Sequence, residues 1–290
     1  MALNPAYPHA LRGIGLMVLA VSTFTCLDTT SKYLSLHYPV PAIVWARYLV
    51  QMVLMVVVLA PRMGVALVRT ANLKLQVIRG VVLAASSLVF LSALSLMPLA
   101  EAASIAFMTP IIIAVLARPV LGERVDARTW LALAGGFVGV LLIVRPGGGL
   151  FTPAALLPLA SAFMMAVYQM LTSKLAGRDA PLTTLFYPAL IGTVLVPLVF
   201  PSELALPSGG FHAALFVLIG VLGGLGHYFL IQAHHYAPTS TLSPFMYAQL
   251  LTAIGLGWLV FGQLPDAVAL SGMATIAASG LLLILGHRKS

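Results

Sequence analysis

Long runs of apolar residues, separated by short breaks, fill almost the whole chain. An α-helix needs about 20 mainly apolar residues to cross the hydrocarbon core of a bilayer. Many breaks carry helix-ending residues, as at Pro39, Pro61 and Pro146. The pattern predicts an all-α integral membrane protein with ten transmembrane helices. The expected segments are 13–33, 41–60, 76–96, 101–118, 127–145, 153–174, 182–200, 211–232, 240–261 and 266–286.

The composition excludes a soluble globular domain. Hydrophobic residues make up 61% of the chain and charged residues 8%, whereas about a quarter of the residues in a soluble domain are charged. The net charge of +8 comes from basic residues scattered between apolar runs, so it favours a lipid bilayer as partner and not a nucleic acid. The single cysteine, Cys26, excludes an intrachain disulfide and a cysteine-based metal site. We expect no metal ion and no cofactor.

The basic residues predict an orientation in the membrane. Cytoplasmic loops carry an excess of Lys and Arg, and with both termini inside, twelve of the 15 basic residues fall on the cytoplasmic side. Lys32 and Arg145 fall outside, and Arg47 lies within a span. We therefore predict a multi-pass protein of the bacterial inner membrane with both termini in the cytoplasm. The inside set is Arg12, Arg62, Arg69, Lys74, Arg79, Arg118, Arg124, Arg128, Lys174, Arg178, Arg288 and Lys289.

An internal repeat divides the ten segments into two groups of five. A shift of 140 residues aligns pairs of identical or similar residues, and a shift of 142 aligns Thr30-Ser31-Lys32 with Thr172-Ser173-Lys174. Five spans per repeat force the second copy to enter the membrane from the opposite side, and inverted repeats place a substrate site near the midplane. The predicted halves are 1–146 and 147–290. The pairs at the first shift include Ala93 and Ala233, Pro98 and Pro238, Phe107 and Tyr247, Gly122 and Gly262, and Asp126 and Asp266.

Two stretches carry a resemblance to a known family. Residues 98–126, PLAEAASIAFMTPIIIAVLARPVLGERVD, and their counterpart 237–266 resemble the signature regions of the EamA-type drug/metabolite transporter superfamily. The Gly122-Glu123 pair matches the family pattern, whereas the second half has Gly262-Gln263. The resemblance covers almost the whole chain. It implies ten helices in two inverted five-helix repeats and a secondary transporter of small metabolites, often acting outward.

Two charged residues stand clear of the ends of the predicted spans. Asp28 in the first span and Arg47 in the second lie at similar depth and have opposite signs. An ionised side chain inside a bilayer is costly, by about 2.5–3.5 kcal/mol on insertion scales, so such residues are functional candidates. They either form an ion pair that ties the two spans together or bind substrate or protons. Lys32, one turn from Asp28, is an alternative partner that would extend outward.

Polar and aromatic residues in other spans predict the lining of a substrate cavity. Gln169, Gln249 and His227 are costly to bury among apolar helices, and His227 titrates near neutral pH when unperturbed. Phe107 and Tyr247 occupy equivalent positions in the two repeats, which suits either a wall that stacks on rings or ordinary core packing. With Asp28 and Arg47 they complete the predicted substrate-binding set. That set is Asp28, Arg47, Phe107, Tyr168, Gln169, His227, Tyr247 and Gln249.

The sequence favours export of amino acids by alternating access. An Asp and Arg pair suits a zwitterion, whereas aromatic and amide side chains suit flavin-like or nucleoside-like metabolites or drugs equally well. Gly147-Gly148-Gly149 leads into Leu150, so the chain has no ATP-binding loop, and protons are a further candidate partner. An intramembrane enzyme is a remote alternative that would need a nucleophile and base at one depth. A monomer and a homodimer both fit the sequence.

Overall fold

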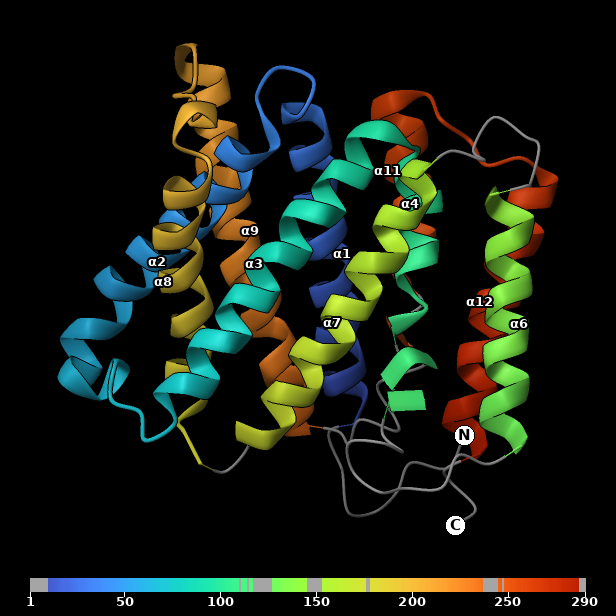
Figure 1. Ribbon diagram of the computed structural model, residues 1–290, viewed down its shortest axis with the longest axis horizontal. Helices are drawn as coiled ribbons and strands as arrows, with labels where there is room; N and C mark the ends of the chain where they lie inside the picture. Colours follow the sequence, from blue (N-terminus) through green and yellow to red (C-terminus); the bar gives the residue numbers. More distant parts are fainter. Residues whose placement is uncertain are drawn as a thin grey trace. The chain divides into compact units, whose positions relative to one another are not determined.

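The computed structural model describes residues 10–109, 111–113, 115–116, 127–144, 153–175, 178–236, 245–246 and 248–286. The described ranges are mainly helical and contain no strand, which confirms the all-α prediction for this part of the chain. Figure 1 shows the helices in sequence colours. In chain order the elements are α1 (Ala10–Leu34), α2 (Val40–Met63), η1 (Gly64–Leu67), α3 (Leu73–Leu96), α4 (Leu99–Ala106), α6 (Ala127–Val144), η2 (Pro153–Ala155), α7 (Leu156–Leu175), α8 (Pro181–Val199), η3 (Pro201–Glu203), α9 (Gly209–Tyr236), α11 (Ala248–Phe261) and α12 (Ala267–Gly286).

Within the described residues, six helices are long and apolar enough to cross a membrane: Leu11–Leu34, Val40–Leu67, Leu73–Leu96, Pro153–Thr172, Pro181–Val199 and Gly209–Leu230. Shorter apolar helices fall in the other four expected segments. The chain is therefore a multi-pass membrane protein by helix length and composition, while the total of ten spans stays a prediction.

Large apolar side chains cover the outer faces of these helices. Val57, Leu198, Leu251 and Leu259 are each exposed to at least 65% of their area. Water would penalise each such side chain by about 25 cal/mol per Å² of exposed apolar area, whereas lipid tails would not. The surface is therefore suited to a hydrocarbon environment.

The helices divide into two compact units, and each unit draws on both halves of the sequence. Unit 1 consists of Met1–Thr29, Met97–Ala155 and Leu222–Ser290, and unit 2 consists of Thr30–Leu96 and Leu156–Val221. The helices α1 and α9 each contribute residues to both units. The sequence halves 1–146 and 147–290 are thus not the units that pack compactly, although they can still be the repeats.

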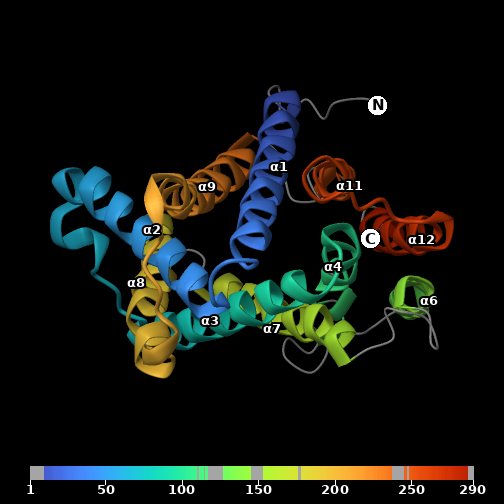
Figure 2. The same ribbon diagram turned by 90° about the horizontal axis from the view of Figure 1, so that it is seen from above.

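In unit 2, α3 runs alongside α7 and also packs on α8, which in turn packs on α2 (Figure 2). Glycine permits one of these contacts. A Cβ atom on Gly192 of α8 would lie 2.3 Å from the ring of Tyr48 on α2, so any side chain there would displace the ring. Small residues commonly allow membrane helices to approach in this way.

One proline inside α8 leaves a backbone carbonyl of this helix without its helical donor, so that a side chain of another helix can donate to it. Pro197 has no N–H, so the carbonyl of Thr193, four residues earlier, loses its helical donor. The indole N–H of Trp45 on α2 donates to this carbonyl at 3.1 Å. A freed backbone group inside the membrane must find such a partner, and the contact fastens α2 to α8.

In unit 1, α6 lies beside α12, and α4 packs on α11 (Figure 1). Met17 and Val21 of α1 form a buried cluster with Ala233 of α9. The sequence has several glycines near the middle of α9, and the typical role of such glycines is close helix packing. A Cβ on Gly226 would lie 2.6 Å from the ring of Phe24, so Gly226 has this role, whereas Gly224 faces open space.

Candidate functional site

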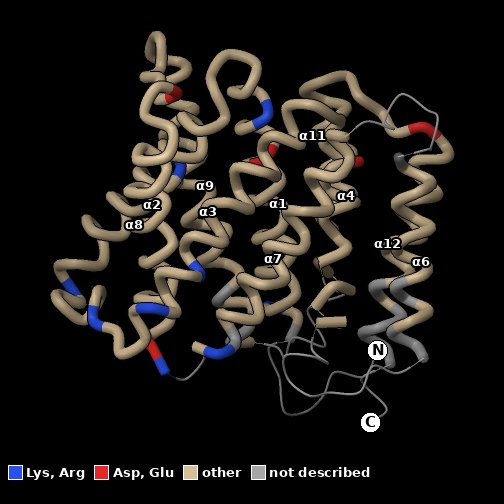
Figure 3. The backbone as a smooth tube through the Cα atoms, in the orientation of Figure 1, with Lys and Arg blue, Asp and Glu red and all other residues tan. Residues whose placement is uncertain are grey.

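Basic side chains gather at one end of unit 2. Figure 3 shows Lys and Arg at the end of α2, at the start of α3 and around the end of α7. Thr70 in the α2–α3 connection donates a hydrogen bond to Asp179 in the α7–α8 connection, so the two connections meet at this end. The exposed basic residues here are Arg62, Arg69, Lys74, Lys174 and Arg178. They agree with the loop assignment used in the orientation prediction.

Asp179 is the acceptor at the centre of this end. Thr70 Oγ1 donates to Asp179 Oδ2 at 2.6 Å, Gln76 Nε2 donates to the same oxygen at 2.8 Å, and Asn72 Nδ2 donates to Oδ1 at 3.4 Å. Burial alone would raise the pKa of Asp179, but these hydrogen bonds outweigh it and hold the pKa below its ordinary value. The carboxylate therefore joins the two connections in its charged form.

Asp179→Asn is expected to lower the unfolding temperature at pH 7 by a few degrees, for a loss of about 1 kcal/mol from weakened hydrogen bonds. Because the folded pKa is depressed, the contribution of Asp179 is complete above the unfolded pKa, near 3.9, and is lost as the pH falls through the folded value. Thermal unfolding in detergent between pH 7 and pH 3 should show the two proteins converging at the acid end. Glu203→Gln, at an exposed carboxylate of the same unit, is the control. Parallel curves for wild type and Asp179→Asn would contradict the linkage.

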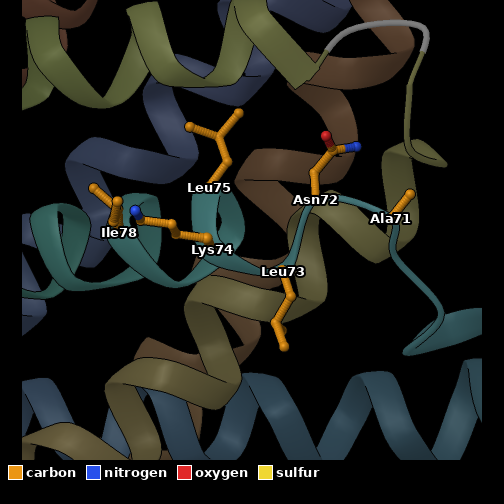
Figure 4. Close-up of a pocket in the computed structure, with 6 residues that line it drawn as sticks. All are labelled: Ala71, Asn72, Leu73, Lys74, Leu75 and Ile78. Carbon is orange, nitrogen blue, oxygen red and sulfur yellow. The ribbon is translucent and has the colours of Figure 1, made fainter.

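A shallow hollow of about 340 Å³ lies next to this network. Its lining, shown in Figure 4, comes entirely from Ala71, Asn72, Leu73, Lys74, Leu75 and Ile78, which belong to one continuous segment. Because a single segment cannot enclose a ligand, and because none of the predicted substrate-binding residues lines the hollow, it does not define the site.

Arg47 is held by neutral groups within unit 2. Its guanidinium Nη2 donates to Ser87 Oγ of α3 at 2.6 Å, and its Cζ lies 4.8 Å from the centre of the Tyr48 ring. The Tyr48 hydroxyl lies 2.8 Å from the same Ser87 oxygen. Arg47 is partly buried and lies two helical turns after the start of the apolar span Val40–Leu67. The prediction that Arg47 lies within a span is therefore confirmed, and Ser87 is a partner that the sequence did not suggest.

Arg79 forms a second cationic site in unit 2. Only 1% of its area is exposed, which differs from the expectation of a cytoplasmic loop residue, because α3 carries it inward from the basic end. Nη1 donates to Thr172 Oγ1 at 3.1 Å, Nη2 donates to the carbonyl of Thr184, and the cation lies 5.1 Å from the Tyr168 ring centre. Nε is buried without a hydrogen-bond partner. The predicted residue Tyr168 thus lies against a buried guanidinium.

A proline also explains why the carbonyl of Thr184 accepts a hydrogen bond from Arg79. Pro188 lies inside α8 and has no N–H, so the carbonyl of Thr184 lacks its helical donor. The guanidinium of Arg79 takes that place. A charged side chain thereby satisfies a backbone group that the membrane interior would otherwise penalise.

Together the two arginines give unit 2 an excess of positive charge. Ser87 lies eight residues after Arg79 on α3, so the two guanidinium sites are separated by roughly 12 Å along the helix. Among the described residues of unit 2, neither guanidinium lies within ion-pair distance of a carboxylate. Asp179 attracts Arg79 electrostatically, but its oxygens accept hydrogen bonds from Thr70 and Gln76. Ser86 and Ser161 join α3 to α7 nearby at 3.0 Å. The positive charge of the two guanidinium groups suits an anionic group.

A row of polar residues along one face of α3 is the sequence feature that could have identified Arg79 as a buried residue. Gln76, Arg79, Ser86 and Ser87 follow the spacing of one helix face, and all four make the contacts described above. The sequence reasoning missed Arg79 because its position near the start of a span is equally typical of a topology marker.

Lys32 and Glu101 are further charged residues that the structure buries. Each is 6% exposed. Lys32 does not extend outward as expected, because its Nζ donates to the carbonyl of Leu94 on α3. Glu101 lies in the first turn of α4, where a carboxylate is favoured by the helix dipole.

In unit 1, His227 of α9 packs against α1 at Phe24, one helical turn before Asp28. The rings of Phe24 and His227 meet edge to face, with centres 5.0 Å apart and an angle of 70°. Asp28 follows Phe24 by four residues on the same face of α1 and is partly buried. Thr25 of α1 lies 2.9 Å from Thr252 of α11. These contacts place Asp28 and His227 in one region of unit 1.

The structure does not bring all predicted residues into these clusters. Gln169 of α7 is exposed, Phe107 is buried just after α4, and Gln249 of α11 is partly buried. Tyr247, the predicted partner of Phe107, lies outside the described residues.

Comparisons with known proteins agree with a transport function. The family model described as "EamA-like transporter family" matches residues 11–145 and 152–286. An S-adenosylmethionine uptake transporter of Rickettsia felis is 25% identical, covering 99% of this chain and 97% of the relative. A riboflavin transporter of Rhizobium johnstonii is 30% identical over 98% and 94%. A pseudopaline exporter of Pseudomonas aeruginosa is 28% identical over 93% and 95%.

A solved structure supports the same architecture. A chain described only as a protein crystal structure aligns with 97% of this chain and 98% of its own length, with a TM-score of 0.64 and 20% identity. At this identity the likeness concerns the fold alone.

Proposed function

We propose that this chain, which belongs to the EamA-like transporter family, exports a small metabolite bearing an amino-acid group across the bacterial inner membrane by alternating access. Family membership and the six long apolar helices make it a multi-pass membrane transporter of small molecules. Its relatives named above are transporters and not enzymes. The substrate class, the direction and the mechanism are the proposal.

The pair of guanidinium groups in unit 2 carries the substrate proposal. Arg47 and Arg79 are held within spans by hydroxyl, carbonyl and aromatic groups, so their charge remains available to a carboxylate brought by the substrate. Ionisable residues inside a membrane mark substrate pathways. The carboxylate of an amino acid accepts the parallel N–H bonds that a guanidinium donates.

A flavin-like or nucleoside-like metabolite is the second candidate. The relatives include transporters named for riboflavin and for S-adenosylmethionine. Tyr168 and Tyr48, each against a guanidinium, provide aromatic faces of the kind on which planar rings stack. A substrate that combines a planar ring with an amino-acid group would use both features.

The proposed architecture is ten spans in two inverted repeats, 1–146 and 147–290, with both termini in the cytoplasm. The double match of the family model supports two repeats, and the exposed basic residues at one end of unit 2 support the orientation. Alternating access would follow from movement between the repeats. Asp28 and His227 are the proposed proton-carrying groups, because an imidazole titrates near neutral pH when unperturbed.

Arg47→Gln is expected to reduce flux of the best amino-acid substrate by about 10- to 100-fold, since a hydrogen bond to a charged group is worth about 1.5–3 kcal/mol. The measurement is flux into proteoliposomes across a panel of amino acids, nucleosides and flavins, with and without a pH gradient. Arg62→Gln removes an exposed arginine from the same helix and should retain flux within about twofold of wild type, because a single exposed charge contributes little.

Flux across this panel of substrates distinguishes the two candidate substrate classes. Flux of amino acids that survives in Arg47→Gln would remove Arg47 from the substrate path. Flux of flavins or nucleosides with none of amino acids would replace the first candidate by the second. Uptake faster than export under the same gradient would reverse the proposed direction.

A further inference from the structure

Two histidines face each other at the end of unit 2 opposite to the basic end. His37 lies in the connection between α1 and α2, and His212 lies in the first turn of α9. Their ring centres are 5.0 Å apart, with an angle of 51° between the rings. His37 is exposed and His212 is partly exposed, so a cation in solution can reach them.

The spacing matches two imidazoles that share one metal ion. Zn²⁺ binds imidazole nitrogen at about 2.0–2.1 Å in tetrahedral geometry. The ring centre then lies roughly 3.2 Å from the metal, and two ligands at the tetrahedral angle place their ring centres roughly 5.2 Å apart. The observed separation of the ring centres, 5.0 Å, is close to this value.

Both rings have an oxygen atom next to Nδ1, as metal-binding histidines commonly do. His37 Nδ1 lies 3.4 Å from the carbonyl oxygen of Tyr33, which can only accept, so Nδ1 carries the proton and Nε2 presents its lone pair. His212 Nδ1 lies 2.8 Å from the Tyr38 hydroxyl. An oxygen partner at the second ring nitrogen is what orients most imidazole ligands of metals.

The Tyr38 hydroxyl is itself fixed in position. Its oxygen accepts the backbone N–H of Ser208 at 2.7 Å and lies 2.8 Å from Ser208 Oγ. With the hydroxyl proton directed to Ser208 Oγ, the oxygen accepts Nδ1–H of His212, and Nε2 of His212 is then free to bind a metal. In this hydrogen-bond arrangement, His212 has the tautomer that metal binding needs.

We propose that His37 and His212 form a binding site for a divalent transition-metal cation of the Zn²⁺, Ni²⁺ or Cu²⁺ class, with water completing the coordination. Imidazole suits these ions. The sequence reasoning predicted no metal site, because the two histidines are 175 positions apart and have no motif spacing. The bound ion would connect the α1–α2 turn to the start of α9.

The test is Cu²⁺ and Zn²⁺ binding to the full-length protein in detergent, purified without a histidine tag. We expect one ion per chain, with electron paramagnetic resonance of bound Cu²⁺ showing coupling to two imidazole nitrogens. His37→Ala and His212→Ala should each weaken binding at least tenfold and leave one coupled nitrogen. Tyr38→Phe, which keeps both ligands, should weaken binding by about tenfold, the lower end of the effect of removing an orienting partner.

The double variant His234→Ala/His235→Ala removes two other imidazoles, both from α9, and should bind as wild type. Unchanged affinity in His37→Ala or His212→Ala, with unfolding temperatures like that of wild type, would overturn the proposal. Loss of the ion in the His234→Ala/His235→Ala variant with retention in His37→Ala would also overturn it.

Discussion

Arg79→Met is expected to abolish most transport and to lower the unfolding temperature by about 2–12 °C. The stability loss follows from the carbonyl of Thr184, which Pro188 deprives of its helical donor and which Arg79 satisfies. A buried carbonyl without a partner costs about 1–3 kcal/mol, and each kcal/mol corresponds to about 2–4 °C in a chain of this order of size. The transport loss follows from removing one of the two guanidinium groups proposed to attract the substrate carboxylate.

A double-mutant cycle separates these two effects. Pro188→Ala supplies the missing N–H, so in the Arg79→Met background it should restore most of the lost unfolding temperature while flux stays at least tenfold below wild type. Pro188→Ala alone should change stability little, because a carbonyl oxygen can accept both the helical N–H and Arg79. The measurements are thermal unfolding in detergent and proteoliposome flux of the best substrate.

Pro197, the second proline inside α8, provides the matched control. Pro197→Ala restores a donor to the carbonyl of Thr193, which the Trp45 indole serves, so it should not rescue Arg79→Met. Equal rescue by both prolines would show a general effect of proline removal and would contradict the assignment of Thr184. Wild-type flux in Arg79→Met would remove Arg79 from the proposed site.

The long helices could be predicted from the sequence because membrane insertion acts on local hydropathy. The predicted segments 41–60 and 182–200 correspond to α2 and α8 within a few residues at each end. Division into compact units could not be predicted, because it depends on which helices touch. The sequence repeat suggests halves of consecutive helices, whereas each unit combines helices from both halves.

The candidate site was predictable only in part, because the depth of a residue follows from the local sequence whereas its partners depend on how the helices pack. The depth of Arg47 follows from its position in an apolar run, but its partner Ser87 depends on how α2 and α3 pack. Arg79 and Lys32 were assigned to the membrane surface because a charge near a helix end usually reaches water. Both instead donate to backbone carbonyls of neighbouring helices, and sequence spacing does not reveal such acceptors.

Close packing of α6 and α12 is the basis of the second large effect. A Cβ atom on Gly139 would lie 2.6 Å from Ile276 Cγ1, 2.8 Å from the carbonyl oxygen of Gly272 and 3.1 Å from the backbone nitrogen of Ile276. Two of these atoms belong to the backbone of α12, so a side chain could be accommodated only by moving the helices apart. Small residues at such crossings are what allow membrane helices to associate.

Gly139→Ala is therefore expected to destabilise unit 1 by about 2–3 kcal/mol, the upper range for overpacking, and Gly139→Leu should prevent recovery of folded protein. Thermal unfolding in detergent and the yield of monodisperse protein measure these effects. Gly255→Ala on α11 introduces the same methyl group where nothing lies within 4 Å, so it should match wild type or be slightly more stable, because alanine favours a helix. An equal effect of the two alanine substitutions would show that helix propensity, and not the α6–α12 contact, decides the outcome.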